Sequence, residues 1–257
     1  MQPDPAERCL ALDTELSLSG FADRCRATER IGDLWHLALA FFAARGITQV
    51  SYHSDDAPED GSRGIATFGF PEDWVCHYLG ANLVKIDPIP DLAARFSKPF
   101  LWSETASITR LLPEQIDYLR QLEEADIGDG LAMQVFGPNL RNAYVGLGFG
   151  HSDFVPTAEQ VFELQCAAQI AHIRYCEITS DRQAKTAGLS PREQEVLRWI
   201  AQGKSTSVIA EILGISRNTV DTVTRRIFAK LGVNDRTTAA IRGLGSGLLK
   251  YSPGGIT

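Results

Sequence analysis

The chain has 257 residues, 44% of them hydrophobic and 22% charged, which is typical of a water-soluble globular protein with one or two domains. No run approaches eighteen apolar residues and no basic segment leads into an apolar one at the start, so we expect neither a membrane span nor a secretory signal. The net charge of −7 is uneven: residues from Leu189 onward carry +5 and the rest −12, which favours one polyanion-binding end.

The first 150 residues alternate between helical and strand patterns. Apolar spacing predicts a helix from about 28 to 45, and strands are predicted at 48–53 and 63–70 around the polar loop 54–62. A helix opens at Pro71, the sequence Asp87-Pro88-Ile89-Pro90 breaks the pattern, and another helix runs from 113 to about 125. Two strands, 130–136 and 142–150, follow on either side of a turn at 137–139.

A long helix is predicted from Thr157 to about Ile178, because Thr157 and Gln160 have the spacing of a capping box. Residues 179–188 are polar and without periodicity, which indicates a linker. The order of elements predicts an α+β fold: an N-terminal α-β-α sandwich with a central antiparallel sheet, followed by a small all-α helix-turn-helix domain.

Three short helices are predicted after Leu189. Serines at 190, 205 and 216 cap them, and glycines at 203, 214 and 232 end them. The second and third helices, joined by a short turn at 214–216, form a helix-turn-helix whose second helix enters the DNA major groove. The residues expected to face inward are Val196, Leu197, Ile200, Ala201, Val208, Ile209, Ile212, Leu213, Val220, Val223, Ile227 and Leu231.

The segment from Leu189 onward, here called the tail, resembles the DNA-binding domain of the LuxR family over about sixty residues. The resemblance implies a role in transcription regulation, with double-stranded DNA as a partner. The residues that carry it are Leu189, Ser190, Glu193, Leu197, Gly203, Ile209, Ala210, Thr219, Val220, Lys230, Leu231, Gly232 and Val233.

The third tail helix supplies the expected DNA contacts. Arg217, Asn218 and Thr219 can grip phosphates, and Asp221, Thr222 and Arg225 are placed to meet base edges. Arg226 and Lys230 are expected to contact the DNA backbone or solvent. The family often has a basic residue where Asp221 stands, and a solvated surface charge is the alternative at each of these positions.

The front of the chain resembles the acyl-homoserine-lactone-binding domain of quorum-sensing LuxR-type regulators. The resemblance implies that Trp74 donates to the lactone carbonyl, that Asp87 accepts from the ligand amide, and that Tyr78 and Trp102 wall the pocket. In the alternative interpretation the aromatic residues are core and Asp87 caps a helix or turn. The residues that carry the resemblance are Pro71, Trp74, Tyr78, Asp87, Pro88, Trp102 and Gly130.

Two positions depart from that pattern. The family usually has a tyrosine where this chain has Phe70, and a small hydroxyl residue where it has Gly146; both hold the acyl carbonyl. Tyr144 shares a strand face with Gly146 and could substitute for them. Alternatively, Gly146 makes room for a longer or bulkier acyl group, or the ligand is not a lactone.

From these patterns we predict a cytoplasmic quorum-sensing homodimer with a ligand-binding and dimerisation domain at 1–178, a linker at 179–188 and a DNA-binding domain at 189–257. The helix from Thr157 is the main dimerisation candidate, helped by one from about Thr237. Five scattered cysteines lack C-x-x-C spacing, and no residue set has catalytic or metal-site spacing, so we expect no enzyme, metal or cofactor. The alternatives are an orphan regulator that answers another small molecule or none, and an antagonist that forms mixed dimers.

Overall fold

A computed structural model describes residues 16–54, 64–138, 141–151, 154–249, 251–252 and 255–256. The chain forms two compact units. Residues 1–136 with 142–175 make the N-terminal unit, and residues 137–141 with 176–257 make the C-terminal unit. Most of the predicted loop at 54–62, and Asn139 in the predicted turn, lie outside the described residues.

A five-stranded antiparallel sheet in the order β2-β1-β5-β4-β3 forms the centre of the N-terminal unit. The strands are β1 (Gln49–Ser54), β2 (Gly64–Phe68), β3 (Phe100–Leu101), β4 (Asp129–Val135) and β5 (Ala143–Gly150). Ser51 of β1 lies opposite Thr67 of β2 and Gly146 of β5. The four longer strands were predicted, whereas β3 was not, because two residues are too few to show alternation.

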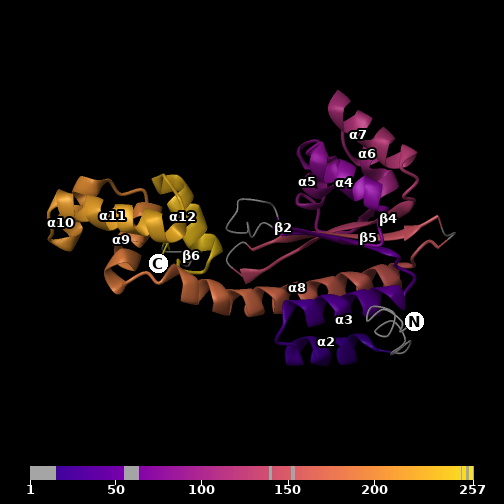
Figure 1. The fold of residues 1–257 in the computed structure, drawn as a ribbon, viewed down its shortest axis with the longest axis horizontal. Coiled ribbons are helices and arrows are strands. Elements are labelled where there is room, and N and C mark those ends of the chain that lie inside the picture. Colours follow the sequence, from indigo (N-terminus) through magenta and orange to yellow (C-terminus); the bar gives the residue numbers. More distant parts are fainter. Residues whose placement is uncertain are drawn as a thin grey trace. The chain divides into compact units, whose positions relative to one another are not determined.

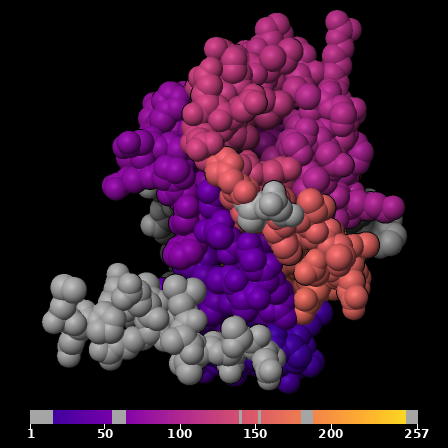
Figure 2. All heavy atoms as spheres, turned by 90° about the vertical axis from the view of Figure 1, so that its right-hand side faces the viewer, coloured from indigo at the N-terminus to yellow at the C-terminus, as the bar shows by residue number. Residues whose placement is uncertain are grey.

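Helices cover both faces of the sheet, which confirms the predicted α-β-α sandwich (Figure 1). One face carries α4 (Glu72–Gly80), α5 (Pro88–Ala93), α6 (Thr105–Ile108) and α7 (Pro113–Glu124), and the other carries α2 (Leu18–Ala27), α3 (Ile31–Ala43) and α8 (Ala158–Ala187). Short 3₁₀ turns, η1 (Leu83–Lys85) and η2 (Trp102–Glu104), precede α5 and α6. Figure 2, turned by 90° from Figure 1, shows the magenta residues at the top of the molecule and the indigo residues at the bottom.

Three helices differ from the predicted pattern. Helix α2 was missed; Ser17 caps it, and only Phe21 and Cys25 are buried, so its apolar stripe is narrow. The segment expected to break the pattern at Asp87 instead begins α5, because Pro88 occupies the first helical position, where no N–H is needed. Helix α8 runs to Ala187 rather than to about 178, since residues 179–187 contain neither glycine nor proline.

The C-terminal unit is built from α9 (Pro191–Ala201), α10 (Thr206–Leu213), α11 (Arg217–Leu231) and α12 (Arg236–Gly245), followed by a hairpin of β6 (Tyr251–Ser252) and β7 (Gly255–Ile256). The three predicted serine caps accept hydrogen bonds from backbone N–H groups. Gly214 and Gly232 end α10 and α11 at φ values of 63° and 62°, in the left-handed region that favours glycine.

Fewer residues of α10 are buried than the sequence predicted. Ile209 is fully buried, but Val208 and Ile212 are 39% and 44% exposed. Helix α10 packs mainly against α11, so the buried stripe is centred on Ile209 and Ala210. Residues on its flanks therefore stay at the surface.

Candidate functional site

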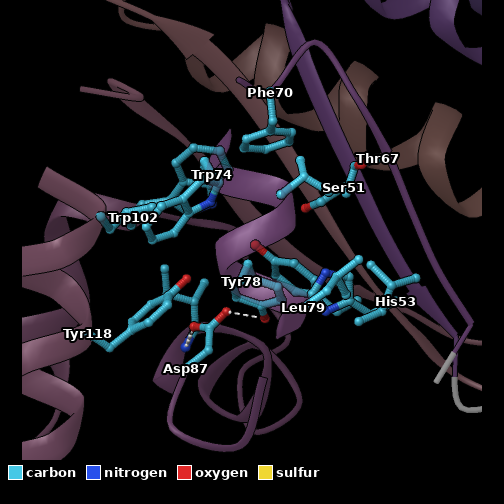
Figure 3. A pocket seen from close by; sticks show the side chains of 15 residues that line it. Ser51, His53, Thr67, Phe70, Trp74, Tyr78, Leu79, Asp87, Trp102 and Tyr118 are labelled. Atoms are coloured by element: carbon cyan, nitrogen blue, oxygen red, sulfur yellow. Dashed lines mark hydrogen bonds between the residues drawn. The ribbon is translucent and has the colours of Figure 1, made fainter. Parts of the chain in front are cut away.

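A cavity of about 80 Å³ lies between the sheet and helices α4, α5 and α7 in the N-terminal unit (Figure 3). Six of the seven predicted ligand-binding residues line it: Phe70, Trp74, Tyr78, Asp87, Trp102 and Tyr144. The seventh, Gly146, lies on β5 beside two of the lining residues. Lining residues that the sequence did not point to are Ser51, His53, Ile65, Thr67, Val75, Leu79, Ile89, Tyr118 and Leu122.

Helix α4 places two aromatic side chains into this cavity. Trp74 and Tyr78 are four residues apart and therefore share one face of the helix. Both rings pack against Tyr118 of α7, with centroid distances of 6.3 and 6.2 Å. Tyr118 is 3% exposed, and its only sequence signal was its place on the buried stripe of α7. The three rings form an apolar wall with polar edges.

Asp87 serves both as a helix cap and as a polar group of the cavity. Its Oδ1 accepts from the Ile89 N–H at 2.9 Å, and its Oδ2 accepts from the Tyr78 hydroxyl at 2.9 Å. Burial raises the pKa of Asp87 to about 6, although hydrogen bonds from Ile89, Tyr78 and Tyr118 act in the opposite direction. A donor from a ligand would favour the charged form further. The cap interpretation and the pocket interpretation are thus compatible.

Two hydroxyl groups occupy the space beside Gly146. A Cβ atom added there would lie 2.5 Å from the Ser51 Oγ and 2.6 Å from the Tyr144 hydroxyl. Ser51 and Tyr144 are 7% exposed, and burial raises the pKa of Tyr144. A glycine at 146 therefore leaves room for one hydroxyl from the neighbouring strand β1 and one from its own strand β5. Ser51 could not be found from the family pattern, because it comes from a different strand.

Trp102 packs on a surface made of glycine. A Cβ at Gly130 or at Gly148 would lie 2.7 or 2.9 Å from its ring, so a side chain at either position would displace it. Phe70 stacks on the other side, with centroids 6.2 Å apart. The Trp102 indole N–H is near the Tyr144 hydroxyl but makes no well-formed hydrogen bond, and the atom is buried. A buried donor without a partner is a candidate for hydrogen bonding to a ligand.

All seven predicted DNA contacts are exposed on α11, whose opposite face is buried: Arg217, Asn218, Thr219, Asp221, Thr222, Arg225 and Arg226. Asp221 accepts a hydrogen bond from the Thr206 hydroxyl at 3.3 Å, which links α11 to the first turn of α10. This contact gives Asp221 a role within the helix-turn-helix.

Lys230 was expected to contact DNA backbone or solvent, but it has a structural partner. Its Nζ lies 2.7 Å from the Glu193 carboxylate and 3.0 Å from the Gly188 carbonyl oxygen. Burial favours the neutral form of Glu193, yet hydrogen bonds from Lys230 and Ser190 outweigh it and keep the pKa of Glu193 below its usual value. Lys230 thus joins the end of α11 to the capping box of α9.

Sequence and structure comparisons agree on both parts of the chain. Residues 30–175 match the autoinducer binding domain, and residues 187–242 match the LuxR family of bacterial regulatory proteins. No helix in the described ranges is both long and apolar enough to cross a membrane.

Curated relatives resemble most of the chain. The transcriptional activator BjaR1 of Bradyrhizobium diazoefficiens is 29% identical over 66% of this chain and 69% of its own length. The quorum sensing-dependent transcriptional regulator VjbR of Brucella ovis is 30% identical over 70% and 71%. Among solved structures, SdiA of Escherichia coli superposes with a TM-score of 0.72 at 19% identity, covering 90% of this chain and 97% of SdiA.

Proposed function

The chain belongs to the LuxR family of quorum-sensing transcription regulators, as an autoinducer-binding domain followed by a LuxR-type helix-turn-helix, and on that premise we propose that its effector is an N-acyl-homoserine lactone. The family consists of DNA-binding regulators and not of enzymes. The proposal therefore concerns which small molecule the N-terminal unit binds and which side chains hold it.

The observation that carries the proposal is the buried carboxylate of Asp87 in the wall of an otherwise mostly apolar cavity. A carboxylate in such a place is costly unless donors reach it, and a lactone amide N–H is a suitable donor. Trp74, which also lines the cavity, offers an indole N–H for the lactone carbonyl. The Tyr78 and Trp102 rings complete the walls.

The acyl carbonyl is the group for which the family's usual donors are missing. We assign it to the hydroxyls of Ser51 and Tyr144, which meet beside Gly146. Phe70 has no hydroxyl and instead stacks on Trp102. The alternative is an orphan regulator that answers another small molecule or none, and the two departures from the family pattern, Phe70 and Gly146, favour it.

Homodimerisation is part of the same proposal. The candidate surfaces are α8, where Phe162 and Ile173 are 65% and 38% exposed, and α12, where Ile241 is 66% exposed. Two copies of α11 would then reach DNA half-sites about 34 Å apart. We also propose that residues 1–178 form the sensing domain and residues 189–257 the DNA-binding domain, with the end of α8 linking them. The protein would then act in the cytoplasm, where it has access to the chromosome.

The test is mass spectrometry of small molecules released from protein expressed with and without a panel of acyl-homoserine lactones, with the melting temperature measured in parallel. A stoichiometric lactone that raises the melting temperature is the expected result. Ligand-free protein that is indifferent to every lactone would contradict the proposal and favour the orphan regulator.

Two substitutions examine the assigned groups. Trp74→Phe removes the indole donor and keeps an aromatic ring, so the thermal shift with lactone should shrink while the ligand-free protein stays folded. Ser51→Ala should weaken lactone binding by about 3- to 10-fold, the usual value of one hydrogen bond. Thr67→Val, at another lining hydroxyl, serves as the matched control and should leave lactone affinity unchanged. Equal affinities for all three variants and the parent would refute the assignment.

A further inference from the structure

The N-terminal unit has a second cavity, on the face of the sheet opposite the first. Its volume is about 270 Å³, and it lies between β1, β2 and β5 on one side and helices α3 and α8 on the other. We call it the rear cavity. The residues that line it are Ile31, Gly32, Leu34, Trp35, Ala38, Phe42, Val50, Tyr52, Ala66, Val145, Ala168, Ala171, His172 and Tyr175.

The alternation of side chains along the strands separates the two cavities. Ser51 and His53 of β1 line the first cavity, while Val50 and Tyr52 line the rear one. On β5, Tyr144 faces the first cavity and Val145 the rear one. The same three strands therefore form a wall of both cavities, and neither cavity is an extension of the other.

Small residues on every side keep the rear cavity open. Alanines contribute from α3, β2 and α8, and a Cβ added at Gly32 would meet no atom within 4 Å. Protein cores normally contain few voids larger than a water molecule, because each void loses dispersion contacts. An apolar cavity can accept an apolar guest. Its volume, about 270 Å³, is just below the roughly 300 Å³ at which typical small-molecule sites begin, which suits a short hydrocarbon chain.

One end of the rear cavity is polar. The Tyr52 hydroxyl and the His172 Nδ1 are 2.8 Å apart, and His172 is only 2% exposed. Tyr175 packs edge-on against Tyr52, with centroids 5.4 Å apart, and stacks on His172. Hydroxyl and imidazole groups that meet at one point of a hydrocarbon wall can orient a ligand with a single polar head.

We propose that the rear cavity is a second small-molecule site, which takes a hydrocarbon chain with one hydroxyl or carboxyl head group placed at Tyr52 and His172. Such a ligand would pack against β1 on the face of the sheet opposite the first cavity and would stabilise the strand. Because β1 also supports the first cavity, each ligand should bind more tightly when the other is present, by the same factor.

The experiment uses the full-length protein and 1-octanol as the probe, with binding followed by calorimetry and by the melting temperature. We expect saturable binding of one octanol per chain, also in protein already saturated with its first-cavity ligand. Ala168→Leu fills the rear cavity and should weaken octanol binding by about tenfold or more. Ala171→Leu, at another lining alanine of α8, should do the same and keeps the test valid if the first variant folds poorly.

Trp74→Phe is the matched variant on the other side of the sheet and should leave octanol binding unchanged. Three results would overturn the proposal: no saturable binding, binding that both filling variants retain, or binding that Trp74→Phe or a first-cavity ligand abolishes. The last result would mean that octanol enters the first cavity.

Discussion

The charge on Asp87 should make the stability of the ligand-free protein depend on pH. Its pKa is raised from an ordinary value of 3.8 to about 6, because burial penalises the carboxylate. This difference corresponds to about 3 kcal/mol of unfolding free energy. The folded state binds the proton more tightly than the unfolded state, so the contribution is fully present below pH 3.8 and is lost as the pH rises through 6.

The assay is urea unfolding of the parent protein and of Asp87→Asn at a series of pH values. The asparagine side chain cannot ionise, so the free-energy difference between the two proteins should change by about 2 kcal/mol between about pH 4.5 and 7.5, with the parent losing relative stability as the pH rises. Asp73→Asn, at an exposed carboxylate in the first turn of α4, should not produce this change. Parallel pH profiles for the parent and Asp87→Asn would refute the reasoning.

Lactone binding should show the opposite trend with pH. An amide N–H that donates to Asp87 favours its charged form, so affinity should increase up to about tenfold between about pH 5 and 7. The Asp87→Asn variant should lose this dependence along with most of its affinity. Titration calorimetry in two buffers would detect the proton released on binding.

Three other substitutions examine separate parts of the structure. Arg225→Ala should weaken binding to a cognate DNA site, by about 1–3 kcal/mol if the side chain hydrogen-bonds to a base, and should leave the ligand-induced thermal shift unchanged. Equal DNA affinity of the variant and the parent in a gel-shift assay would show that Arg225 does not contact DNA. Gly146→Ala should lower the melting temperature, since its Cβ would overlap the Ser51 and Tyr144 hydroxyls, and overpacking costs about 1–3 kcal/mol; an unchanged melting temperature would contradict the close contact. Lys230→Met should destabilise the C-terminal unit by about 1–3 kcal/mol in urea unfolding because it leaves Glu193 without its partner, whereas Lys204→Met at an exposed site should not.

Local chemistry explains why much of the tail could be predicted. A serine cap and a glycine in the left-handed region each act within a few residues, so the sequence contains their whole signal. The same holds for Trp74 and Tyr78, whose spacing of four places them on one face of α4. Helix α5 was missed because Asp87-Pro88 can either end or begin a helix, and here it begins one.

Local sequence patterns were enough to identify the family, most of the helices and strands, and the residues that are candidates for ligand and DNA contacts. Which groups converge from distant parts of the chain could be seen only in the folded protein. Ser51 and Tyr144 meet beside Gly146 because β1 pairs with β5 across nearly a hundred residues, and Lys230 reaches Glu193 because α11 packs on α9. Pairing between strands and packing between helices are set by the whole core, so no local pattern encodes them.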